Sequence, residues 1–149
     1  MVVNNKYARI AVGVDGSAAS GDALEWAAAE AQMRDAVLEI DHVWSLPNLG
    51  YAGYISQLDD FESDAKALLD EIVANATIKY KDITIESNLL HGAPSQALID
   101  RGKACDLVVV GSRGHGGFSG LMLGSVSQQL VHHASFPVVV IHPQRAVSI

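Results

Sequence analysis

The chain has 149 residues, of which 49% are hydrophobic, and a formal net charge of −7 at pH 7. This length is typical of one domain with a substantial core, so we expect residues 1–149 to form a single domain. A nucleic-acid-binding surface needs clustered cations, but the ten Lys and Arg residues are scattered along the chain. We therefore expect no nucleic-acid partner.

Short apolar runs and a single cysteine argue against a membrane protein, a secreted protein and a protein held together by disulfides or a cysteine-bound zinc. The longest apolar runs, such as residues 107–110, are far shorter than the roughly 20 residues of a membrane-spanning helix. Residues 1–6 lack the apolar stretch of a secretory signal. Cys105 alone allows no internal disulfide and no cysteine-based zinc cluster. We therefore expect a soluble, cytoplasmic protein with no membrane partner.

The first half of the chain alternates β-branched runs with helical patterns. Residues 9–14 predict a strand, and an alanine-rich helix follows to about Arg34. Residues 37–44 predict the second strand. Residues 45–55 predict an unusually long loop, after which Ser56 is expected to cap an amphipathic helix.

The second half continues the alternation. Pro94 suits the first position of a short helix that is expected to end near Lys103. A further helix is expected to begin near Ser125, after a glycine-rich loop. The strands predicted in this half are 83–90, 106–110 and 137–141.

This order of elements, βαβαβαβαβ, predicts an α/β fold. We expect a Rossmann-like, doubly wound sheet of five parallel strands, in the order 3-2-1-4-5, with four helices on its two faces. Ligands of such folds bind beyond the carboxyl ends of the strands. The turns that follow 9–14 and 106–110 are both strand-to-glycine-to-helix turns, and we expect them to lie side by side.

The strongest functional signal is the stretch from Gly111 to Ser125, which holds six glycines between positions 111 and 124. Glycines let successive backbone N–H groups converge on phosphate oxygens, and the following helix adds its N-terminal donors and dipole. This predicts an anion site. The alternative is a plain loop before a capped helix, because Ser125 and Gln128 fit a capping box.

The spacing Gly111-x2-Gly114-x9-Gly124-Ser125 resembles the ATP-binding signature of universal stress proteins, G-2x-G-9x-G-(S/T). The resemblance extends over nearly the whole chain. It includes three further segments and the closing strand, which are 15–17 (Asp-Gly-Ser), 41–43 (Asp-His-Val), 92–94 (Gly-Ala-Pro) and 137–140 (Pro-Val-Val-Val).

The resemblance implies an ATP-binding regulatory protein of the stress response that acts as a homodimer. A metal ion, Mg²⁺ first of all, would offset the charge of the triphosphate. The final strand, Pro137 to Ile141, would pair across the dimer axis. The residues expected to cradle the triphosphate are Gly111, Gly114, Gly124 and Ser125, and those expected near phosphate or ribose are Arg113 and Val126.

The resemblance implies a ligand-binding role for two further residues, and each of them also has an ordinary structural explanation. Asp15 would face the sugar or the metal, but it could equally be a turn residue or a cap of the first helix. Val43 would offer backbone groups to the adenine edge, and it could also be ordinary core.

No dedicated catalytic base or positioned nucleophile stands out, so we expect no enzyme beyond a slow ATPase. The P-loop pattern is absent, and the six histidines show no metal-ligand spacing. Three alternatives remain open at this point. They are a family member that binds AMP or cyclic AMP, a nucleotide-dependent enzyme such as a ligase or a hydrolase (slow or of ordinary turnover), and a dimeric interaction module with an empty pocket.

Overall fold

A computed structural model describes residues 8–46, 51–113 and 123–143, and for residues 51–58 it describes the backbone alone. The strands are β1 (Arg9–Gly13), β2 (Val37–Trp44), β3 (Ile85–His91), β4 (Leu107–Gly111) and β5 (Val138–Ile141). The helices are α1 (Ala18–Arg34), α2 (Tyr51–Lys79), α3 (Pro94–Gly102) and α4 (Ser125–His133).

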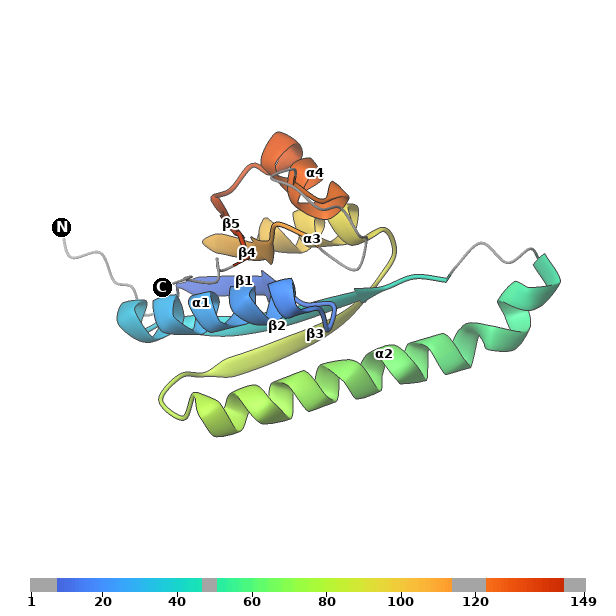
Figure 1. The fold of residues 1–149 in the computed structure, drawn as a ribbon, viewed down its shortest axis with the longest axis horizontal. Helices are drawn as coiled ribbons and strands as arrows, with labels where there is room; N and C mark the ends of the chain where they lie inside the picture. Colours follow the sequence, from blue (N-terminus) through green and yellow to red (C-terminus); the bar gives the residue numbers. More distant parts are fainter. Residues whose placement is uncertain (1–7, 47–50, 114–122, 144–149) are drawn as a thin grey trace, which may run out of the picture.

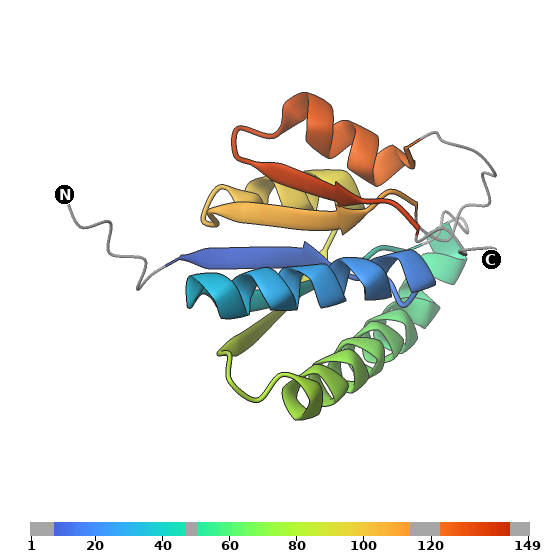
Figure 2. The same cartoon turned by 60° about the vertical axis from the view of Figure 1, so that its left-hand side comes forward.

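The five strands form one parallel sheet in the order β3-β2-β1-β4-β5, which confirms the predicted fold class and strand order. Helices α1 and α2 cover one face, and α3 and α4 cover the other (Figures 1 and 2). Strand β1 pairs with β4, so the two similar strand-to-helix turns are neighbours, as expected.

Alternation along the central strands divides the core into two layers, because successive side chains point to opposite faces. Ile10, Val12 and Val109 face α1 and α2, whereas Ala11 and Val110 face α3 and α4. The buried face of α1 consists of small residues, which let the helix lie close to the sheet: Ser20, Ala23, Ala27, Ala28 and Ala31.

The start of α2 differs from the prediction. The helix begins at Tyr51, inside the expected loop 45–55, so Ser56 lies within the helix and is not its N-cap. Residues 51–55 contain no proline, and the single glycine, Gly53, costs a helix only about 1 kcal/mol. Packing of the rest of this 29-residue helix outweighs that penalty.

Across the described ranges, no helix is both long enough and apolar enough to cross a membrane.

Candidate functional site

A cavity of about 300 Å³ lies at the carboxyl ends of β1, β2 and β4, beside the N-termini of α3 and α4. This is the point at which the chain switches from one side of β1 to the other, where doubly wound folds bind ligands. The residues that line the cavity are Gly13, Val14, Asp15, Ser20, Asp41, Val43, Pro94, Leu98, Val110, Gly111, Ser112, Arg113, Gly124, Ser125, Val126 and Ser127.

The turn after β1 brings Asp15 to the cavity wall. Gly16 has φ +81°, a conformation that L side chains rarely adopt. The Asp15 carboxylate accepts a hydrogen bond from the backbone N–H of Ser17 at 2.9 Å, and Ser17 in turn caps α1 by accepting from the N–H of Ser20. Asp15 is therefore a turn residue, and it also lines the cavity.

The turn after β4 packs closely on α1. A Cβ at Gly111 would lie 2.9 Å from the backbone of Ala19, so a side chain at this position would force the two elements apart. Glycine at 111 is thus required by packing, whatever the ligand. The backbone of the next residue, Ser112, accepts hydrogen bonds from Gly124 N at 2.6 Å and from Ser127 Oγ at 3.1 Å, which holds the start of α4 beside β4.

The N-terminus of α4 opens onto the cavity without a side-chain cap within the described segments. Gly124 is the N-cap residue, and Ser125 is the first helical residue. The capping box of Ser125 and Gln128 is therefore wrong. Gly124 occupies the cap position, where its N–H donates to the carbonyl of Ser112 and its own carbonyl accepts from the N–H of Gln128. The first N–H groups of a helix that lacks a side-chain cap favour an anion.

Strand β2 contributes two residues to the cavity wall. Val43 is half-buried and packs against the layer under α3 and α4, so it is both a core residue and a lining residue. Asp41 was not singled out as a site residue from the sequence, although an aspartate within a predicted strand of the sheet is a signal that could have identified it.

The Asp41 side chain is 1% exposed. Its Oδ1 accepts a hydrogen bond from Asn88 Nδ2 at 2.9 Å, and no donor reaches Oδ2 from the described residues. Burial, reinforced by the Glu39 carboxylate and opposed by the hydrogen bond from Asn88, raises the pKa of Asp41 to about 7. Asp41 is thus a group that changes its charge near neutral pH.

Glu39 lies two residues before Asp41 on the same face of β2 and is completely buried. Its two oxygens accept hydrogen bonds from the guanidinium of Arg101 on α3, and Oε2 also accepts from Arg9 at 2.7 Å. Burial alone would raise the pKa of Glu39, but the bonds from the two arginines hold it below its ordinary value. Glu39 is therefore a charged, paired carboxylate.

The structure brings together seven of the eight residues that the sequence suggested as a site. They all line the same cavity: Asp15, Val43, Gly111, Arg113, Gly124, Ser125 and Val126. Gly114 lies outside the described residues. Among the residues that the structure covers, no group of three or more His, Cys, Asp or Glu is arranged to hold a metal ion.

Comparisons with known proteins agree on one family. The profile described as "Universal stress protein family" matches residues 6–142. A universal stress protein from Mycolicibacterium smegmatis is 35% identical over 139 residues, which cover 91% of this chain and 46% of the relative. The chain thus spans about half the length of the curated relatives it matches.

Solved structures share the fold over almost their full length. The universal stress protein UspA from Lactobacillus plantarum superposes with a TM-score of 0.82 at 23% identity, with 91% of this chain and 97% of that chain covered. A universal stress protein described as a complex with cAMP is 28% identical, with a TM-score of 0.67 and the same coverage.

Proposed function

The chain belongs to the universal stress protein family, and we propose that it is a regulatory protein that binds ATP with Mg²⁺ in the cavity at the carboxyl edge of its sheet. The observation that carries this proposal is the N-terminus of α4. It opens onto the cavity with a glycine as its N-cap, and Arg113 lines the same cavity. Backbone N–H groups and one arginine can hold a phosphate in a chain whose net charge is negative.

The volume of the cavity is suited to a small ligand. Its volume of about 300 Å³ lies at the lower end of small-molecule sites, which run from about 300 to 1,000 Å³. In this proposal the phosphates lie at Gly124, Ser125 and Val126, the sugar lies toward Asp15, and the base lies toward the backbone of Val43.

Mg²⁺ fits this arrangement as a partner of the phosphates. The ion keeps several waters and is usually held by one or two carboxylates together with phosphate oxygens, so it does not need a cage of protein ligands. Asp15 lies in the turn after β1 and lines the cavity, and its carboxylate is the candidate ligand from this chain.

Calorimetric titration tests the proposed ligand. ATP with Mg²⁺ is expected to give a binding isotherm and to raise the melting temperature, because a ligand that binds only the folded state stabilises it. AMP and cyclic AMP should be titrated in parallel, because the 28%-identical relative in complex with cAMP supports cyclic AMP as the second candidate. No heat and no thermal shift with millimolar ATP and Mg²⁺ would show that the proposed ligand is wrong.

We propose binding without appreciable turnover. A phosphate-release assay tests this. Release at the rates of typical enzymes, roughly 1–1,000 per second, would contradict the proposal of a binding protein and support a nucleotide-dependent enzyme.

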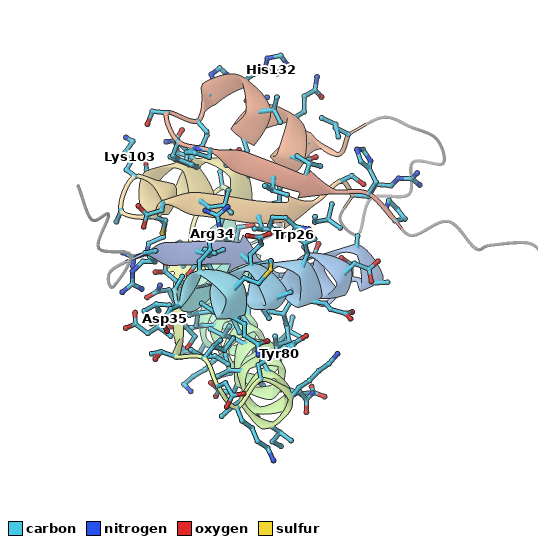
Figure 3. All side chains as sticks on the ribbon, turned by 90° about the vertical axis from the view of Figure 1, so that its left-hand side faces the viewer. Trp26, Arg34, Asp35, Tyr80, Lys103 and His132 are labelled. Carbon is cyan, nitrogen blue, oxygen red and sulfur yellow. The ribbon has the colours of Figure 1, made fainter. Side chains whose placement is uncertain are left out.

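We further propose a homodimer that pairs through β5, the edge strand of the sheet. All four residues of β5 are apolar and only partly buried. Trp26 projects from α1 toward the side of β5 and packs into the same layer as Val139 and Ile141 (Figure 3). The carbonyls of Pro137 and Ile141 accept hydrogen bonds from β4, so the alternate residues Val138 and Val140 direct their backbone groups to the open edge. An apolar edge of this kind is normally paired or covered.

Sedimentation of the wild type and of Val140→Pro tests the dimer. The wild type is expected to be a dimer at tens of micromolar, and the proline should shift it toward monomer, because it removes an edge N–H and leaves the bonds to β4 in place. Ile78→Ser, which removes an apolar residue that is 70% exposed on α2, is the control and should remain dimeric. A wild-type monomer would contradict the proposal.

A further inference from the structure

We propose that Asp41 holds a proton in the wall of the nucleotide cavity and that this proton is linked to ligand binding: the neutral acid is the form that accepts an anionic ligand, and loss of the proton weakens binding. This inference rests on the proposed function, because it requires an anion in the cavity.

The first step concerns the contacts of Asp41. Oδ1 is occupied by the amide of Asn88, whereas Oδ2 is buried and receives no hydrogen bond from the described residues. An ionised carboxylate oxygen in that position would lack a donor from the part of the chain that the structure describes, and this is a costly arrangement. A protonated Oδ2 would be a donor itself, and the Glu39 carboxylate on the same face of β2 is an acceptor for it.

The second step concerns the charges around Asp41. Glu39 disfavours its ionisation, and Arg101 on α3 favours it. The arginines, however, are already paired. Arg101 bonds both oxygens of Glu39, and Arg9 on β1 bonds Oε2 of Glu39 and the exposed carboxylate of Glu86. Two further groups near Asp41 within the described ranges are Asn88, which is neutral, and Cys105, a thiol whose pKa is raised to about 11 by burial. The two arginines are thus matched by the two carboxylates Glu39 and Glu86, and this leaves Asp41, the third carboxyl, as the group that takes the proton.

The third step links this proton to the ligand. Asp41 lies on β2 and pairs in register with Gly13 of β1. The proposed phosphate site lies at the carboxyl end of β4, which pairs with the other side of β1. Strands lie about 4.8 Å apart, so the Asp41 carboxyl and the phosphates would be separated by about 10 Å. At this distance in a partly covered cavity, two like charges repel enough to weaken binding by about three- to tenfold. A bound nucleotide also excludes water from the wall, which further favours the neutral acid.

The sign of the effect follows from the pKa of Asp41, which is about 7 in the folded protein. Ligand binding raises this pKa further, so the complex takes up a proton above pH 7. Affinity should therefore be highest below pH 6 and fall as the pH rises from 6 to 8.5.

Nucleotide affinity of the wild type, Asp41→Asn and Asp82→Asn, measured by calorimetry from pH 5.5 to 8.5, tests this inference. Asparagine has the shape of the neutral acid, keeps an acceptor for Asn88 and cannot ionise. Asp82 is exposed and does not line the cavity, so its variant is the matched control for the loss of one acidic side chain. Ionisation of the ligand phosphate is common to all three proteins and cancels in the comparison.

Asp41→Asn is expected to match the wild type at pH 5.5 and to bind about three- to tenfold more tightly at pH 8.5, whereas Asp82→Asn follows the wild type throughout. Parallel profiles for the wild type and Asp41→Asn would overturn the inference and leave the proposed function standing. The absence of binding by the wild type at every pH would instead contradict the proposed function itself, and the inference with it.

Discussion

Replacing Arg101 with methionine is expected to lower the free energy of unfolding by about 3 kcal/mol, because the change leaves the buried Glu39 carboxylate with one cation in place of two. Glu39 is 0% exposed, and Arg101 supplies hydrogen bonds to both of its oxygens. Methionine retains much of the apolar stem of arginine, so most of the decrease in the free energy of unfolding comes from the lost ion pair with Glu39 and little of it from lost packing. Urea denaturation monitored by circular dichroism measures the difference.

Arg34→Met is the matched control. Arg34 also pairs with a glutamate, Glu30, four residues earlier on α1, but its side chain is 55% exposed. Surface pairs of this kind contribute less than about 1 kcal/mol. Glu39→Gln should restore part of the stability in the Arg101→Met background, because it removes a buried charge that Arg9 alone compensates only in part. Equal losses for Arg101→Met and Arg34→Met would show that the buried pair has no special role.

Gly124→Val is expected to weaken nucleotide binding by about a hundredfold or more while the fold persists. Gly124 is the N-cap of α4 and lines the cavity, where a branched side chain would keep the phosphates from the first N–H groups of the helix. Losing two charge-assisted hydrogen bonds, at roughly 1.5–3 kcal/mol each, accounts for that factor. The backbone of Gly124 has φ −66° and ψ 168°, which valine adopts readily, so the loss of stability should stay near 1 kcal/mol.

Affinity and melting temperature should be measured on the same preparation of Gly124→Val. Gly21→Ala is the control glycine variant: Gly21 lies within α1, and a Cβ there would meet open space. It should bind normally and gain a little stability from helix propensity. Gly111 is unsuitable for this purpose, because a side chain there would collide with the backbone of Ala19 and destabilise the fold. Wild-type affinity in Gly124→Val would mean that the start of α4 does not hold the phosphates.

The sequence by itself determined the order of elements, the fold class and the edge of the sheet at which the cavity lies. These features depend on patterns that are local in the chain. Runs such as Val108-Val109-Val110 identify a central strand, and the glycines that end β1 and β4 mark the turns that must meet at the carboxyl edge. Seven of the eight residues suggested as a site lie around one cavity for this reason.

Only the tertiary structure decided which residues meet across the sheet. Arg101 lies 62 residues from Glu39, and Asn88 lies 47 residues from Asp41. Their contacts depend on the register of β2 with β3 and on the packing of α3, which no local pattern specifies. The same holds for Gly111, whose glycine is required by the approach of α1, and for Gly124, which caps α4 because Ser112 holds it there. Periodicity is a property of neighbouring residues, whereas burial, pairing and the charge of a group such as Asp41 arise when distant segments exclude water together.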